Sequence, residues 1–370
     1  MRASLEVIAM DRRPLAVLAV AVIMMLFAKV PAPADQPTPE PAAASPSTAV
    51  ASPVPSPASS APLSAIPLTA TSPLPVPRRP GFFDYMTVDA QARRLLAAHT
   101  GSSQLLVVDV KTGSVVQAVD LGRQAGGAGV AVDVRDGKYF VGAADDKVVD
   151  INRRYLNVQA FIPMPAGIDA IAFDPANDTL YADEDGGTHV WAINAKTDKV
   201  VAAIDIPAGP EYIDYDPVSN KIFQNISPDP SVMLEIDPAT NAIVARWPLA
   251  PATRVHGLAI DPATSRVFSV GADGTLAVVD EKTGSIVTTV TVAERVDQIA
   301  FDPGLRRLYC PSGLGEMSIV QETDAGATLL GTVTIPRGAH TVAVDPVSHA
   351  VWISYGAADN DYVQEFTANP

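Results

Sequence analysis

Four carboxylates and two imidazoles occupy one position in successive copies of an internal repeat. That position lies five residues before an aspartate that ends each apolar segment. Six of its seven occupants are Asp, Glu or His, whereas the residues between them and the aspartates are mainly apolar. Gathered around one axis, such groups could form an oxygen-and-nitrogen site for a metal ion. They could also act as general acids and bases, because crowded carboxylates push their pKa values apart. The seven occupants are Asp84, Ala128, Asp169, Glu211, His256, Asp297 and His340.

We predict a ligand site from these residues and a metal site from most of them. The same alignment brings His99 to this rim, from the end of the second segment of the first unit. Ca²⁺, Mg²⁺ and Zn²⁺ are the candidate cations, and no catalytic residue is identified. The alternative is a solvated rim of paired side chains, with Arg254 and Arg295 near enough in sequence to neutralise it. The predicted ligand-binding residues are Asp84, Asp169, Glu211, His256, Asp297, His340 and His99. The predicted metal ligands are Asp169, Glu211, His256, Asp297 and His340.

The repeat that carries this position predicts the fold. Successive repeat aspartates are separated by 44, 41, 42, 45, 41 and 43 residues. Five of the seven are followed by proline, a pair that ends a strand and sets a turn, because proline fixes φ and aspartate bonds its own backbone. The seven aspartates are Asp89, Asp133, Asp174, Asp216, Asp261, Asp302 and Asp345.

Each unit contains four short apolar runs, and no stretch shows a sustained helical period. Four strands in about 42 residues are typical of one propeller blade. We therefore predict an all-β, seven-bladed β-propeller with four-stranded blades. The last unit has room for only three strands before Pro370. Residues 72–77 are expected to supply the missing outer strand, where their prolines are tolerated at a sheet edge.

The units resemble the YVTN-type β-propeller repeats of exported bacterial proteins. The closest matches are residues 171–204 and 258–290, with their Asp-Pro turns and Lys-Thr-containing hairpins. The chain is also similar, more distantly, to the seven-bladed lactonase and amine-dehydrogenase subunit propellers. It departs from the repeat at Val134, which stands in place of proline, and at the irregular hairpin 152–155. The resemblance implies a seven-bladed propeller that serves as a binding scaffold, a surface protein or an enzyme.

The N-terminus resembles an export signal followed by a spacer. Arg12 and Arg13 precede an uncharged apolar run of 14 residues, which is short for a membrane span. Small residues at 32–34 predict cleavage after Ala34, and the competing interpretation is an uncleaved membrane anchor. From Pro31 to Pro80 the chain has 15 prolines in 50 residues, a composition that favours an extended spacer. The expected domains are a signal peptide (1–34), a Pro/Ala/Ser-rich linker (35–71) and the propeller (72–370).

The net charge and the cysteine count of the chain limit which functions are possible. A net charge of −15 argues against nucleic acid as a partner, and a single cysteine excludes an intramolecular disulfide. We predict an extracytoplasmic protein, whether periplasmic, secreted or on the cell surface. Its favoured function is a binding or interaction scaffold for a protein or small molecule at the channel face. The alternatives are a metal-assisted, lactonase-like hydrolase and a redox-associated subunit that docks a cofactor-bearing partner.

Overall fold

A computed structural model describes residues 68–76, 81–358 and 360–368. The chain divides into two compact units, residues 1–59 and 60–370, and every described residue belongs to the second. The predicted signal peptide and most of the predicted linker lie outside the described residues. In the described part, no helix has the length and hydropathy needed to cross a membrane.

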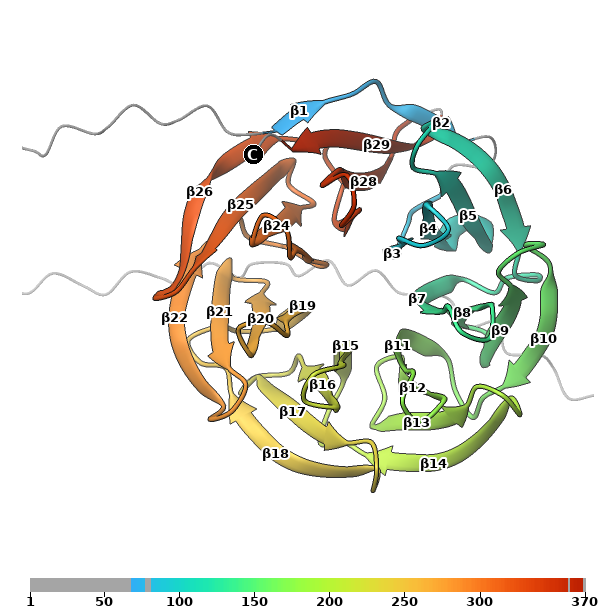
Figure 1. The fold of residues 1–370 in the computed structure, drawn as a ribbon, viewed down its shortest axis with the longest axis horizontal. Helices are drawn as coiled ribbons and strands as arrows, with labels where there is room; N and C mark the ends of the chain where they lie inside the picture. The colour runs from blue at the N-terminus through green and yellow to red at the C-terminus, as the bar shows by residue number, and fades with distance from the viewer. Residues whose placement is uncertain (1–67, 77–80, 359, 369–370) are drawn as a thin grey trace, which may run out of the picture. The chain divides into compact units, whose positions relative to one another are not determined.

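Seven antiparallel sheets stand around a central axis, which confirms the predicted seven-bladed propeller (Figure 1). We number blades one to seven in chain order, and the strands of each blade run outwards from the axis. The innermost strands are β3 (Tyr85–Asp89), β7 (Gly127–Asp133), β11 (Ile168–Asp174), β15 (Pro210–Asp216), β19 (Val255–Asp261), β23 (Ala300–Asp302) and β27 (Thr341–Val344). The second strands are β4 (Arg94–His99), β8 (Lys138–Ala143), β12 (Thr179–Glu184), β16 (Lys221–Ile226), β20 (Arg266–Gly271), β24 (Arg307–Ser312) and β28 (Val351–Gly356).

The third and fourth strands complete each blade, and one 3-10 turn, η1 (Thr100–Ser102), interrupts blade one within the described residues. The third strands are β5 (Gln104–Asp109), β9 (Lys147–Asn152), β13 (His189–Asn194), β17 (Val232–Asp237), β21 (Thr275–Asp280), β25 (Glu316–Thr323) and β29 (Asp361–Ala368). The fourth strands of blades one to six are β6 (Ser114–Asp120), β10 (Val158–Pro163), β14 (Lys199–Asp205), β18 (Ala242–Pro248), β22 (Ser285–Thr291) and β26 (Gly326–Thr334).

The ring closes through residues from the start of the described chain. Strand β2 (Leu74–Val76) pairs antiparallel with β29, as predicted for residues 72–77. Strand β1 (Leu68–Ala70) also pairs with β29 and extends the same edge. It lies before residue 72, so the propeller includes residues that the sequence analysis assigned to the linker. Blade seven is therefore built from both ends of the second unit.

Apolar side chains fill the junctions between neighbouring blades. The described residues form seven buried hydrophobic clusters, and each cluster joins two adjacent sheets. The junction of blades seven and one contains Trp352, Phe83 and Met86, all at most 2% exposed, together with Val76 from the closing strand. Because each junction needs both neighbours, burial of apolar surface favours the closed ring over an open array.

The repeat aspartates fix turns and connect blades. Asp174 Oδ1 accepts a hydrogen bond from the backbone N–H two residues later, at 2.8 Å, and Asp302 does the same at 2.9 Å. Arg93 pairs with Asp345 across the closing junction. Arg153 Nε lies 2.6 Å from Asp89 Oδ2 and joins blade two to blade one. The irregular hairpin 152–155 thus supplies an ion pair between blades.

Candidate functional site

The predicted acid and imidazole side chains meet at one end of the central channel. Asp169, Glu211 and His256 are the second residues of their inner strands, whereas Asp297 precedes β23 and His340 precedes β27. A pocket of about 40 Å³ is lined by Asp84, Asp169, Glu211, His256 and Asp297, but not by His340. That volume holds a few water molecules or one ion. We call this end of the channel, with its six acid and imidazole side chains, the channel mouth.

His256 acts as an internal counter-ion at the channel mouth. Its Nδ1 lies 2.9 Å from Glu211 Oε2 and 3.3 Å from Asp297 Oδ1. Asp297 and Glu211 together raise the pKa of His256 to about 10. The ring is therefore a protonated imidazolium at neutral pH, and it neutralises part of the negative charge. Because an imidazolium has no free lone pair, His256 cannot bind a metal ion in this state.

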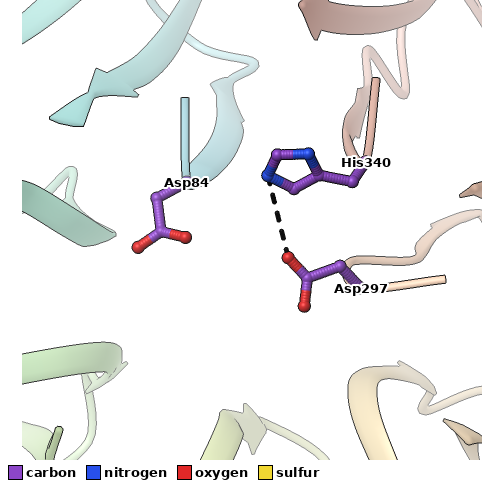
Figure 2. Close-up of side chains that lie close together, drawn as sticks. All are labelled: Asp84, Asp297 and His340. Atoms are coloured by element: carbon purple, nitrogen blue, oxygen red, sulfur yellow. Dashed lines mark ion pairs between the residues drawn. The ribbon is translucent and has the colours of Figure 1, made fainter. Parts of the chain in front are cut away.

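Asp84, Asp297 and His340 converge on one space from three blades (Figure 2). One ligand atom from each of them lies within 4.8 Å of the other two. His340 Nε2 is 3.8 Å from Asp297 Oδ2, and its Nδ1 is 2.7 Å from the carbonyl oxygen of Gly338. A carbonyl only accepts hydrogen bonds, so Nδ1 carries a proton and Nε2 faces the space. Metal-binding histidines are commonly oriented by such a bond.

The structure selects among the predicted metal ligands. Asp297 and His340 belong to the convergent group, and Asp84, predicted only as a ligand-binding residue, joins them. Asp169 and Glu211 line the same pocket but lie outside this group, and His256 is held as a counter-ion.

Burial and mutual repulsion raise the pKa values of acids near the channel mouth. Burial, followed by the charge of Asp297, raises the pKa of Asp84 to about 6. Burial raises the pKa of Asp183 to about 8, although its carboxylate accepts bonds from Ala170 N at 2.6 Å and Gln224 Nε2 at 3.0 Å. Burial and the charge of Asp183 hold the pKa of Asp169 well above its usual range. Ionisation of these acids in the folded protein therefore brings like charges together at the channel mouth, and a bound cation would favour their ionised forms.

These raised pKa values predict how stability depends on pH. The unfolded chain loses the protons of Asp84 and Asp183 near pH 4, whereas the folded chain keeps them up to about pH 6 and 8. The unfolded state then binds fewer protons, so the free energy of unfolding should fall as pH rises from about 4 to 8. Urea denaturation across this range measures the effect.

Other aspartates set the acid limit of stability. Burial alone would raise the pKa of Asp345, but hydrogen bonds from Arg93 and Ser348 outweigh it and lower the pKa. Stability should therefore also fall below about pH 4, as that carboxylate is protonated. Asp84→Asn should reduce the loss between pH 4 and 6, and Asp146→Asn, at an exposed side chain, should leave it unchanged. A free energy of unfolding that rises from pH 5 to 8 would contradict this interpretation.

His99 lies away from the channel mouth. Its side chain is 1% exposed, and its Nε2 is 2.6 Å from Asp361 Oδ2. The imidazole stacks on Phe83, with ring centroids 4.4 Å apart. The same Asp361 oxygen accepts a hydrogen bond from Gly81 N at 2.8 Å. The structure thus gives His99 a packing role between blades one and seven and does not bring it to the predicted ligand set.

Three residues that the sequence analysis did not select block the channel below its mouth. Tyr85 and Tyr212 come from blades one and four, and their hydroxyl oxygens are 2.5 Å apart. Gln298 Nε2 donates to the carbonyl oxygen of Met86 at 2.8 Å and lies 3.4 Å from Tyr212 Oη. We call Tyr85, Tyr212 and Gln298 the plug. All three occupy the position four residues before a repeat aspartate. The other four units have Gly, Ala or Thr there, so the larger side chains could have been noticed in the sequence.

Comparison with known proteins supports the fold. A chain of hydrazine synthase from Kuenenia stuttgartiensis matches with a TM-score of 0.67 and 15% identity, over 78% of this chain and 96% of that one. A chain of the mitotic checkpoint complex matches with a TM-score of 0.70 and 13% identity, over 87% of this chain and 99% of that one. No family model and no curated protein matches. The propeller fold is thus supported, and the YVTN resemblance stays a prediction.

Proposed function

We propose that the protein is an exported binding scaffold that holds a divalent cation, and through it a ligand, at the channel mouth. The observation that carries this proposal is the convergence of Asp84, Asp297 and His340. Two ligands on opposite sides of a calcium ion stand about 5 Å apart, because each oxygen lies about 2.4 Å from the ion. Ligand atoms within 4.8 Å of one another therefore suit a single coordination sphere.

The charge balance supports a cation at this place. Four carboxylates surround the pocket, and His256 is paired with two of them, Glu211 and Asp297. Asp84 and Asp169 remain without a cationic side chain in hydrogen-bond contact among the described residues. The imidazole suits Zn²⁺ better than Ca²⁺ or Mg²⁺, whereas the spread of the ligand atoms matches the larger coordination sphere of Ca²⁺, so Zn²⁺ would require the three side chains to move closer together. Three protein ligands would leave coordination positions free for a partner's carboxylate or carbonyl oxygen.

The scaffold role draws on the fold and on the N-terminal sequence. The predicted signal and proline-rich spacer support export, with the propeller held away from a surface. A propeller chain in the mitotic checkpoint complex is part of an assembly, which supports an interaction role for this fold. Each protein with this fold differs in its site, so the role of this chain depends on the channel mouth.

Binding of the cation should stabilise the folded protein. At a hundredfold excess over Kd the gain is about 2.7 kcal/mol, which for a domain of this size corresponds to a rise in Tm of roughly 5 °C. Thermal unfolding followed by circular dichroism, with EDTA or with Zn²⁺, Ca²⁺ or Mg²⁺, measures this. Asp84→Asn should greatly reduce the rise, because it removes the negative charge of one ligand without breaking an ion pair.

The matched control is Asp205→Asn, which removes an exposed carboxylate of blade three and should keep the full rise. In EDTA, Asp84→Asn should be at least as stable as the unaltered protein at pH 8, since it removes a carboxylate that repels its neighbours. A Tm that no metal raises, or an equal rise in Asp84→Asn, would overturn the cation site and leave the channel mouth as solvated polar surface.

A further inference from the structure

Below the plug the channel widens into a second pocket of about 330 Å³. Its wall combines residues of blades one, four, five, six and seven. Val88, Ile260, Phe301 and Val344 are partly exposed there, so the lining side chains are mainly apolar, although polar atoms contribute almost half of the exposed surface. Tyr212 and Gln298 line both pockets, so the plug separates this space from the channel mouth. The volume falls within the range of small-molecule sites.

Asp214 is the only acidic or basic side chain among the residues that line this second pocket. It lies two residues before the repeat aspartate of blade four. The other six units have Thr87, Ala131, Ala172, Ala259, Ala300 and Ala343 at the same position. The fold is therefore built with a small uncharged residue at this position in every other blade. The carboxylate of Asp214 is therefore a departure that the repeat itself does not require.

The carboxylate of Asp214 has no cationic partner among the described residues. Its Oδ1 accepts a hydrogen bond from Tyr215 N at 2.8 Å. The titratable groups that interact with it are Tyr212 and Tyr85 from the plug, and Asp216 along its own strand. Burial, followed in smaller part by the charge of Asp216, raises the pKa of Asp214 to about 6. At pH 8 the group is an ionised and uncompensated carboxylate beside apolar walls, which is costly without a counter-charge.

We propose that the pocket below the plug binds a small primary amine with an apolar body. The ammonium would pair with Asp214, and charge-assisted hydrogen bonds of this kind are short and strong. The hydrocarbon part would lie along Ile260, Phe301 and Val344. The lining residues indicate both parts of the ligand. The apolar side chains favour an alkyl or aryl body, and the single carboxylate favours one positive charge. This site is separate from the cation site and does not depend on it.

Isothermal titration calorimetry with butyl-, hexyl- and octylammonium chloride at pH 8 tests the proposal on the full chain. Affinity should increase about fourfold with each added methylene until the pocket is filled. Asp214→Asn should weaken hexylammonium binding at least tenfold, and Asp205→Asn should leave it unchanged. Hexanoate, which has the same body and the opposite charge, should not bind. The proposal is overturned if no alkylammonium binds, or if Asp214→Asn binds hexylammonium as tightly as the unaltered protein.

A second measurement needs no variant. Alkylammonium ions stay charged between pH 5 and 8, whereas a carboxyl group with a pKa of about 6 is only about one-tenth ionised at pH 5. Hexylammonium should therefore bind the unaltered protein about tenfold more weakly at pH 5 than at pH 8. Equal affinity at the two pH values would exclude Asp214 as the partner of the ammonium group.

Discussion

Deletion of residues 68–76 should lower the free energy of unfolding by about 4 kcal/mol or more, because it removes β1 and β2 from blade seven. Val76 is 1% exposed, and burial of a valine side chain stabilises by about 2 kcal/mol. Backbone pairing of both strands with β29, and the bond from Gln364 Nε2 to Thr71 O at 2.8 Å, each add about 1 kcal/mol per hydrogen bond. Urea denaturation of purified protein gives the value.

An equally long deletion of residues 40–48, within the proline-rich segment, is the control and should change stability little. The deletion of 68–76 should also promote self-association, because it leaves β29 as an unpaired edge. Dynamic light scattering tests this second effect. Equal free energies of unfolding for the two deletions would contradict closure of the ring through the N-terminal strands.

The blades could be predicted from sequence because their information is local. A strand, a turn and the next strand lie within one unit, and the spacing of the repeat aspartates places each inner strand around the axis. The residue five before each aspartate reaches the channel mouth for the same reason. Alternation of side chains along a strand does not extend to this position, because the pairing register of the inner strands shifts between the residues six and three before the aspartate, as at Ile168/Ile171 and Val255/Leu258.

Contacts between units were not predictable in the same way. His99 has the residue type and the alignment of a rim residue, but its partner Asp361 is 262 residues away and buries it between blades. Arg153 lies in a hairpin that departs from the repeat, and only the ring shows that it reaches Asp89 of the preceding blade. Such pairings depend on the rotation between blades, which the repeat length does not encode.

The same limit applies inside the channel. The plug residues stand four residues before repeat aspartates, and Asp214 stands two residues before one. Most other units have Gly, Ala or Thr at these two positions, so the exceptions can be recognised in the sequence. The departures were visible in the sequence, but their consequence depends on how far the side chains reach across the axis. Gln298, for example, bonds the backbone of Met86, which is 212 residues away.

Gln298→Ala should lower the free energy of unfolding by about 3 kcal/mol. The side chain is 4% exposed, and its amide forms hydrogen bonds with backbone groups of two inner strands, as a neighbouring strand would. Its Oε1 accepts bonds from Met86 N at 3.2 Å and Val342 N at 3.1 Å, while Nε2 donates to Met86 O. Truncation leaves three buried backbone groups without partners, at about 1 kcal/mol or more for each. Urea denaturation measures the loss.

Gln117→Ala is the matched control, because Gln117 also donates to a backbone carbonyl, that of Leu156 at 2.8 Å, but from an exposed position. It should cost less than about 1 kcal/mol, since water replaces the lost bond.

Gln298→Ala should also remove part of the wall between the two pockets. In the wild-type protein, affinity should stop increasing at the alkyl chain length that fills the pocket. In Gln298→Ala this limit should lie at a longer chain, because the alkyl group can extend past Tyr212 towards the channel mouth. Loss of stability without that change would show that the two tyrosines alone close the channel, and an unchanged free energy of unfolding would show that Gln298 does not brace the ring.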